Sequence, residues 1–258
     1  MNDEIQRATL RPLIVPHSSF IVGDSLGLGL FFTGTDTGVG KTFVTAAVTR
    51  ILRRQGHGVV VCKPVAAGAS WKDGRWISDD TVALAEAGGV AGDLSRITPW
   101  TFADPVAPPV AAKRAGVEFT LDKIIRAVQD RREPEKAILI EGVGGLLCPL
   151  TENETVADLV AALHMPLVVV ARRSLGTLNH TLLTLEVART RDLRVVGVVI
   201  NETVLPQTLA EETNLVELQK RMQVPLLATV LFQTGSAASV PASLEAVDWW
   251  KLANQKSE

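Results

Sequence analysis

The sequence has few of the features that mark several large classes of protein. Its only cysteines, Cys62 and Cys148, form no CxxC pair and no metal-binding spacing, so we expect reduced thiols. The four histidines are scattered, which argues against a zinc site. A formal net charge of −2 leaves no basic footprint for nucleic acid or a membrane surface. No apolar run approaches the ~20 residues that span a bilayer. We therefore expect a soluble, cytoplasmic protein.

The length and composition suit one large domain. The chain has 258 residues, 47% of them hydrophobic and 21% charged, which is enough to bury a core. Residues 1–26 lack the basic start and long apolar centre of a signal peptide, and we expect an N-terminal extension or a poorly ordered arm. Residues 27–258 contain no repeat, low-complexity segment or linker, which favours a single α/β domain there.

Short apolar runs alternate with segments of helical periodicity along most of the chain. Strands are predicted at 28–32, 59–62, 137–140, 167–171, 195–200 and 226–230, and helices at 43–54, 79–87, 121–131, 156–164, 178–190, 209–222 and 242–253. Residues 65–78 read as a loop, and 99–109 as an irregular connection before a short helix. This rhythm predicts a three-layer α/β fold with a mostly parallel central sheet, in which ligands bind at the carboxyl ends of the strands.

The segment GTDTGVGKT, Gly34–Thr42, has the pattern of a phosphate-binding loop. It follows an apolar strand and precedes a helix, so its backbone N–H groups and the positive end of the helix dipole would face phosphate oxygens. Lys41 would reach the β/γ-phosphates, and the Thr42 hydroxyl would ligate Mg²⁺. The alternative is a tight turn that happens to carry a lysine. Predicted nucleotide contacts here are Gly38, Val39, Gly40, Lys41, Thr42 and Phe43.

Polar residues directly after the apolar strands are further site candidates, each with a structural alternative. Lys63 could stabilise a transferred phosphoryl group or could be a solvated strand-end lysine. Glu141 could hold Mg²⁺ or could be a solvated carboxylate. On spacing alone, Asp79 reads as a helix-capping acid. Asn201 could pair with adenine or form an Asx turn, and the helix start at 176–180 could bind a carboxylate.

Taken together, these segments resemble the dethiobiotin synthetases, ATP-dependent enzymes of biotin synthesis. The matching segments appear in family order over roughly residues 28–233: GTDTGVGKT (Gly34–Thr42), KPVAAG (Lys63–Gly68), SDD (Ser78–Asp80), PWTFADPVAP (Pro99–Pro108), EGVGGLLCPL (Glu141–Leu150), LGTLNHTLLT (Leu175–Thr184) and VVGVVIN (Val195–Asn201). The resemblance implies a P-loop NTPase-like fold, usually in a homodimer. It also implies ring closure of 7,8-diaminononanoate with CO₂ and ATP, through a carbamate and a carbamic-phosphoric anhydride, with release of ADP and phosphate.

The resemblance also implies roles for individual residues. Thr42, Asp79 and Glu141 match the Mg²⁺ ligands, and Lys63 and Lys41 match the catalytic lysines. Further ATP contacts are implied at Gly142, Val143, Gly144, Asn201 and Glu202, and substrate contacts at Lys63, Ala67, Gly176, Thr177, Leu178 and Asn179. The helix start at 176–179 would anchor the substrate carboxylate across the dimer interface. Where many relatives have hydroxyl residues after KPVA, this chain has Ala67 and Ala69.

Three rival functions fit the sequence less well. A P-loop switch ATPase that positions proteins or DNA usually has an additional lysine early in the loop, where this chain has Thr35 and Asp36. The synthetase-like domain of a cobyrinate amidotransferase would require a further nucleophile-bearing domain. A catalytically inactive binding protein is disfavoured because the residues expected to bind metal and phosphate are retained.

Overall fold

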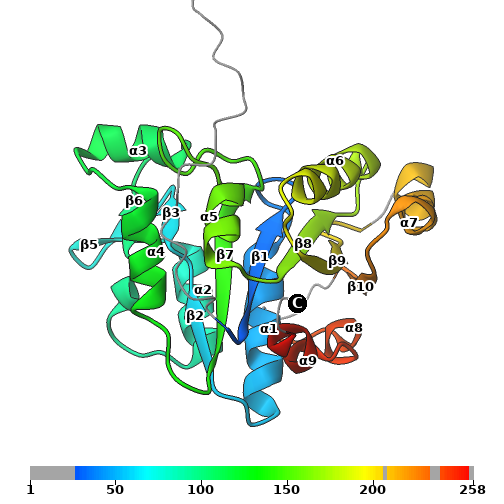
Figure 1. The fold of residues 1–258 in the computed structure, drawn as a ribbon, viewed down its shortest axis with the longest axis horizontal. Helices are drawn as coiled ribbons and strands as arrows, with labels where there is room; N and C mark the ends of the chain where they lie inside the picture. Colours follow the sequence, from blue (N-terminus) through cyan, green and yellow to red (C-terminus); the bar gives the residue numbers. More distant parts are fainter. Residues whose placement is uncertain (1–26, 206–207, 233–238, 256–258) are drawn as a thin grey trace, which may run out of the picture.

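A six-stranded parallel sheet forms the centre of the molecule. The computed structural model describes residues 27–205, 208–232 and 239–255, so the predicted N-terminal extension lies outside the described residues. All neighbouring strands of the sheet run parallel, in the order β10-β9-β8-β1-β7-β2 (Figure 1). Its strands are β1 (Gly29–Gly34), β2 (Val59–Cys62), β7 (Ala137–Gly145), β8 (Leu167–Arg172), β9 (Val195–Asn201) and β10 (Leu226–Val230). The predicted α/β fold with a mostly parallel sheet is confirmed.

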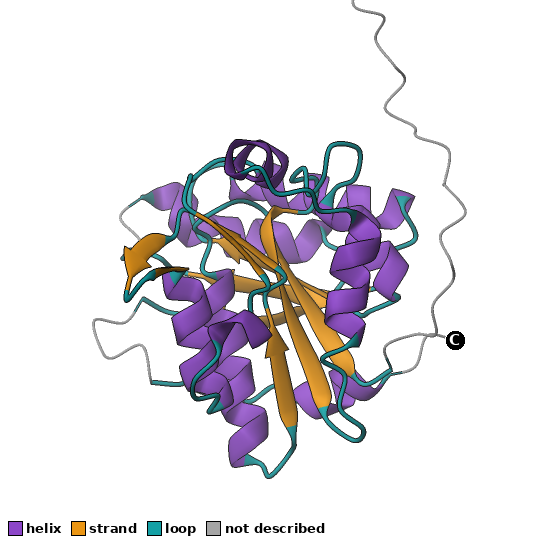
Figure 2. Ribbon diagram, turned by 90° about the vertical axis from the view of Figure 1, so that its left-hand side faces the viewer, coloured by secondary structure: helices purple, strands orange, loops and turns teal. Residues whose placement is uncertain are grey.

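Helices cover both faces of this sheet, which gives the three layers visible in Figure 2. One face packs against α1 (Lys41–Arg54), α2 (Asp79–Gly88), α8 (Ala242–Glu245) and α9 (Trp249–Asn254). The other packs against α3 (Pro108–Ala115), α4 (Leu121–Gln129), α5 (Val156–Leu163), α6 (Thr177–Thr190) and α7 (Leu209–Arg221). Among these described helices, none has both the length and the apolar character needed to cross a bilayer.

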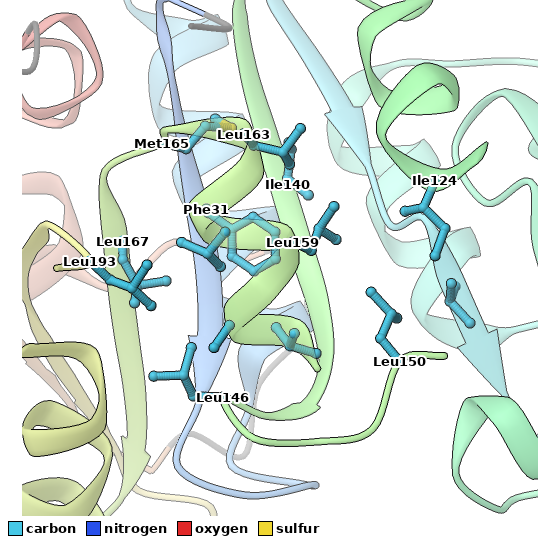
Figure 3. Close-up of a cluster of buried hydrophobic side chains, with 14 of the residues drawn as sticks. Phe31, Ile124, Ile140, Leu146, Leu150, Leu159, Leu163, Met165, Leu167 and Leu193 are labelled. Atoms are coloured by element: carbon cyan, nitrogen blue, oxygen red, sulfur yellow. The ribbon is translucent and has the colours of Figure 1, made fainter. Parts of the chain in front are cut away.

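Strand β1 shows why the sheet strands read as continuous apolar runs. Phe31 points into the cluster under α5, whereas Leu30 and Phe32 point into the cluster under α1. Figure 3 shows the Phe31 ring beside Leu159 of α5. Successive side chains point to opposite faces of the sheet, and helices bury both faces. Every residue of the strand is therefore apolar or small. Each such buried side chain contributes about 1.5–3 kcal/mol through the hydrophobic effect.

The segment predicted as a loop at 65–78 instead contains three short strands. They are β3 (Val65–Ala67), β4 (Ser70–Lys72) and β5 (Arg75–Ile77). Strands β4 and β5 form an antiparallel hairpin whose turn residues, Asp73 and Gly74, both have positive φ. An Asp-Gly pair is a strong hairpin signal, but three-residue strands are too short to show alternation. The prediction of a loop was therefore wrong.

Two further segments differ from the prediction. Residues 99–109 contain β6 (Trp100–Phe102), which pairs in parallel with β3, after a 3₁₀ turn at Leu94–Arg96, labelled η1. The predicted helix 242–253 is divided into α8 and α9. Asp248 explains the break, because its carboxylate accepts a hydrogen bond from Lys251 N at 2.9 Å and so caps the start of α9.

Candidate active site

The phosphate-binding loop joins β1 to α1 at the centre of the sheet. Its last glycine, Gly40, is the N-cap of α1 with φ 95°, and no side chain caps the helix start. The free N–H groups and the dipole of α1 are therefore available to an anion. Gly40 also has no room for a side chain, because an added Cβ would lie 2.1 Å from Asn201 Nδ2. Val39 is buried in the core, and Phe43 packs against the same cluster.

Lys41 folds back over the loop that precedes it. Its Nζ donates to the Asp36 carbonyl oxygen at 3.0 Å, and the side chain is largely buried. Burial lowers the pKa of Lys41, and the charge of Lys63 acts in the same direction, while Glu141 and Asp80 oppose the shift. The Lys41 ammonium thus lies beside the start of α1 among groups of both charges, where the negative charge of a polyphosphate would balance its positive charge.

Lys63, Asp80, Glu141 and Thr42 form one connected polar cluster. The Lys63 Nζ donates to Glu141 Oε1 at 2.7 Å and also to Asp80 Oδ2. The Thr42 hydroxyl donates to the same Glu141 Oε1 at 2.8 Å. Lys63 is only 4% exposed and Glu141 only 1% exposed, so neither is a solvated strand-end residue. Lys63 directly follows β2, Glu141 is in the middle of β7, and Thr42 and Asp80 lie in the first turns of α1 and α2.

The charges of this cluster stabilise one another. Burial acts to lower the pKa of Lys63, but the charges and hydrogen bonds of Glu141 and Asp80 outweigh it and raise that pKa. Burial acts to raise the pKa of Asp80, but the Lys63 charge and hydrogen bonds from Lys63 and Thr42 outweigh it and lower that pKa. At neutral pH the cluster therefore contains a protonated lysine and an ionised Asp80.

The structure does not bring Asp79 to this cluster, contrary to the predicted metal set. The Asp79 side chain is 85% exposed, and its Oδ1 pairs with Lys72 Nζ at 3.1 Å. Asp79 is the first residue of α2, where the helix dipole stabilises a carboxylate. The next residue, Asp80, points inward instead, because successive helical residues are rotated by about 100° around the axis. Asp80, and not Asp79, contacts Lys63 in this cluster.

The oxygen atoms of this cluster fit a hard divalent cation. Glu141 Oε2 is buried and has no hydrogen-bond partner among the described residues, so one carboxylate oxygen remains for a ligand. Within the described ranges, no three His, Cys, Asp or Glu side chains form a cage of their own. A cation here would depend on Thr42, Asp80, Glu141, water and phosphate oxygens, which is how Mg²⁺ is commonly held.

A cavity of about 560 Å³ lies over the cluster and the phosphate-binding loop. It is large enough for a small substrate next to a triphosphate. Its lining comprises Thr37, Gly38, Gly40, Lys41, Thr42, Lys63, Ala67, Asp80, Pro105, Val106, Ala107, Pro108, Glu141, Val143, Gly144 and Cys148. Predicted contacts from three distant segments thus share one cavity. Asp80, Cys148 and the 105–108 segment belong to motifs visible in the sequence, but nothing in their spacing shows that they face the cavity.

The glycines after Glu141 have separate structural reasons. A Cβ on Gly142 would lie 2.9 Å from the Phe31 ring, so this residue allows close packing in the core rather than lining the cavity. Gly144 has φ 61°, a left-handed conformation that favours glycine, and a Cβ there would lie 2.8 Å from Cys148 Sγ. Val143 and Gly144 line the cavity, as the predicted nucleotide contacts should.

Asn201 and Glu202 lie at the end of β9, and the described structure gives both of them protein partners. The Asn201 Nδ2 donates to the Val39 carbonyl oxygen at 3.0 Å and so holds the phosphate-binding loop. This contact is neither a base contact nor an Asx turn. Glu202 pairs with Arg173, and its Oε2 accepts a hydrogen bond from Phe232 N at 2.9 Å. Both side chains are buried, which limits their access to a nucleotide.

The start of α6 lies apart from the cavity over Lys63. Gly176 is the N-cap with φ 90° and no side-chain cap, so the helix start is open to an anion. Among the described residues that line the 560 Å³ cavity, Gly176, Thr177, Leu178 and Asn179 are absent. Thr177 instead borders a smaller cavity beside Thr35 and Asp36, and Asn179 borders one between α6 and α7. Within one chain, the structure does not bring this predicted substrate contact to Lys41 and Lys63.

Comparison with known proteins identifies close relatives of this chain. A protein-family model described as an AAA domain matches residues 28–238. An ATP-dependent dethiobiotin synthetase of Aromatoleum aromaticum is 38% identical over 83% of this chain and 95% of that protein. A protein of the same name from Anaeromyxobacter dehalogenans is 46% identical over 68% of this chain and 77% of that protein. Among solved structures, the signal recognition particle receptor FtsY of Elizabethkingia anophelis with GDP gives a TM-score of 0.45 at 13% identity, covering 94% of this chain and 68% of that chain.

Proposed function

The chain belongs to the ATP-dependent dethiobiotin synthetase family, a family of ligases, and from this we propose that it converts 7,8-diaminononanoate, CO₂ and ATP into dethiobiotin, ADP and phosphate. One amine of the diamine adds to CO₂ and loses a proton, giving a carbamate. A carbamate oxygen attacks the γ-phosphorus of ATP and ADP leaves, giving a carbamic-phosphoric anhydride. The second amine then attacks the carbonyl carbon, and phosphate leaves as the cyclic urea closes.

The residues of the cavity fit this sequence of steps. Phosphoryl transfer needs positioning and charge compensation rather than a covalent nucleophile. The open start of α1 and the Lys41 ammonium would hold the β- and γ-phosphates. Lys63 lines the same cavity, where its ammonium would hold the carbamate and stabilise the charge that develops during transfer. When bound to Thr42, Asp80 and Glu141, Mg²⁺ would neutralise phosphate charge.

Substrate orientation would come from two sides of the cavity. Ala67 and the 105–108 segment line the wall beside Lys63 with small and apolar groups, which suit the hydrocarbon chain of the diamine. The carboxylate end would need an anion site at some distance, and the uncapped start of α6 has that chemistry. Because α6 does not border this cavity in its own chain, we propose that a second copy of the chain supplies it.

Apolar side chains on the surface of α6 support such a homodimer. Leu183 is 56% exposed, and together with Leu182 and Leu185 it borders a cavity of about 530 Å³ between α6 and α7. Large apolar side chains in solvent are common at protein interfaces. The proposed reaction would take place in the cytoplasm, where ATP and bicarbonate are available.

One observation carries the proposal: Lys63, held by two carboxylates, shares a cavity with the phosphate-binding loop of a chain in this family. The test is phosphate release by the full chain with the diamine, bicarbonate, ATP and Mg²⁺, each omitted in turn. We expect release to require all four and dethiobiotin to appear by mass spectrometry. Phosphate release that proceeds equally without the diamine, with no cyclic product, would refute the function.

The matched variant is Lys63→Gln, which removes the ammonium but keeps a polar side chain. We expect nucleotide binding to persist while ring closure falls by a factor of about 10² or more, the order expected for loss of a group that stabilises transition-state charge. Normal turnover of Lys63→Gln would show that Lys63 has no part in the chemistry.

A further inference from the structure

The Lys63 ammonium pairs with both carboxylates of the proposed metal site. It donates to Asp80 Oδ2 and to Glu141 Oε1, and the latter atom also accepts the Thr42 hydroxyl hydrogen bond. All three side chains that fit a divalent cation are therefore bonded within the cluster, and the buried Glu141 Oε2 has no hydrogen-bond partner among the described residues. An ammonium and a metal ion are both cations, so when they share the same two carboxylates each repels the other and weakens its binding.

We propose that Lys63 is an internal counter-cation that competes with the divalent metal for Asp80 and Glu141. Binding of the metal with its nucleotide displaces the ammonium from the carboxylates into the cavity, where the carbamate lies. This inference rests on the proposed function for the identity of the nucleotide and the carbamate. The competition itself concerns only the cation and the three side chains.

The surroundings of Lys63 allow the side chain, but not the backbone, to move. The Lys63 backbone N–H donates to the Ile97 carbonyl oxygen at 2.9 Å, and Pro64 and Val65 beside it are buried. Lys63 borders the cavity of about 560 Å³, which Ala67 with its small side chain also lines. Displacement of the ammonium thus requires rotation about the Lys63 side-chain bonds and no movement of the backbone.

Charge balance makes the displacement favourable when a nucleotide is present and unfavourable otherwise. Without phosphates, Asp80 and Glu141 are balanced by Lys63, with the Lys41 ammonium nearby. A divalent ion added to that set would be repelled by two buried ammonium groups. Triphosphate oxygens bring several negative charges to the same place, so they can accept both the metal and the lysines. The catalytic ammonium would therefore be released only when the metal–nucleotide complex has bound.

The test measures Mn²⁺ binding to the full chain without nucleotide, from the electron paramagnetic resonance signal of free Mn²⁺. Lys63→Met removes the charge and keeps much of the side-chain volume. We expect it to bind Mn²⁺ on the order of tenfold or more tightly than the unaltered protein, because it removes a unit positive charge a few ångströms from the ion. Lys63→Arg keeps the charge and should retain the weak binding of the unaltered chain.

Lys72→Met is the matched control, because Lys72 pairs with the exposed Asp79 rather than with the cluster. It should leave Mn²⁺ affinity unchanged. Equal affinity in Lys63→Met and the unaltered protein, or weaker binding in a folded Lys63→Met, would overturn the inference. If Lys63→Met fails to fold by circular dichroism, Lys63→Gln is titrated in its place. Since no diamine is present, this result is independent of whether the chain makes dethiobiotin.

Discussion

Replacing Asp80 and Asp79 one at a time by asparagine tests the assignment on which the site depends. The two carboxylates are adjacent in the chain and both lie in the first turn of α2. Asp80 contacts Lys63 and Thr42, whereas Asp79 contacts only the exposed Lys72 in the described structure. Each substitution removes one negative charge and changes the volume hardly at all. Any difference between the variants therefore reports where the two side chains point.

The expected magnitudes differ by about two orders of magnitude. Asp80→Asn removes one of the two carboxylates that fit Mg²⁺ and one of the two partners of Lys63. Changes in even the outer shell of a metal site cost about 10–100-fold in affinity or activity, so we expect kcat/KM for ATP to fall by at least about 10², or roughly 2.7 kcal/mol of transition-state stabilisation. The Asp80 side chain is 47% exposed, so its contribution to the free energy of unfolding is small, about 1 kcal/mol.

Asp79→Asn should change kcat/KM by no more than about twofold, because exposed ion pairs contribute little. The assay is steady-state phosphate release at saturating diamine and bicarbonate, with ATP and Mg²⁺ varied, and urea denaturation as the control for folding. The diagnostic feature is a raised Mg²⁺ requirement in Asp80→Asn alone. If Asp79→Asn lost activity and Asp80→Asn kept it, the placement of both side chains would be wrong.

The remaining predictions concern the loop that binds phosphate and the two thiols. Gly40→Ala should abolish nucleotide binding, because the added Cβ would collide with the Asn201 amide. Gly38 also has a positive φ, 70°, but open space around it, so Gly38→Ala should lower the free energy of unfolding in urea by only about 1–2 kcal/mol. Asn201→Ala leaves the Val39 carbonyl without its partner and should cost about 1–3 kcal/mol, with a raised KM for ATP. Burial raises the pKa of Cys62 to about 12, so at pH 8 it stays a thiol and should react with a disulfide reagent only after unfolding. Cys148 borders the cavity and should react first, more slowly with nucleotide bound.

Each of these has an outcome that would contradict it. Tight nucleotide binding by Gly40→Ala would show that the loop and Asn201 are not in contact. An unchanged KM for Asn201→Ala would separate that hydrogen bond from the site. Rapid labelling of Cys62 in the folded protein would contradict its complete burial in the core.

The sequence could predict the parts of the site that depend on local pattern. A strand, a glycine-rich loop and a helix are consecutive in the chain, so the phosphate-binding loop is recognisable from Gly34–Thr42 alone. The position of Lys63 directly after β2 follows from a buried strand and the geometry of parallel sheets. Glu141 was expected just past a strand that ends at residue 140, but β7 continues to Gly145 and Glu141 is in its middle. The specific roles of residues in binding metal, nucleotide or substrate came only from the family resemblance, and they are proposals here.

Contacts between distant segments could not be predicted in this way. Asn201 lies 162 residues from Val39, and its amide was expected to meet a base rather than the loop carbonyl. A strand end identifies which edge of the sheet a residue occupies, but not which of several neighbouring groups its side chain reaches. Which group the Asn201 side chain reaches depends on where β9 ends relative to the loop after β1, and the packing of the helices on both faces of the sheet sets that position.

The exchange of Asp79 for Asp80 has a more local cause. At a helix start, two adjacent acids both suit the dipole, and a pattern of residue types treats them alike. Only the direction of the helix relative to the sheet decides which of the two faces Lys63. The choice matters because the Lys63 ammonium is buried, and a buried charge without a partner is strongly destabilising. Glu141 and Asp80 are its two partners, so the ion pairs that stabilise the cluster use the same carboxylates that would bind the metal.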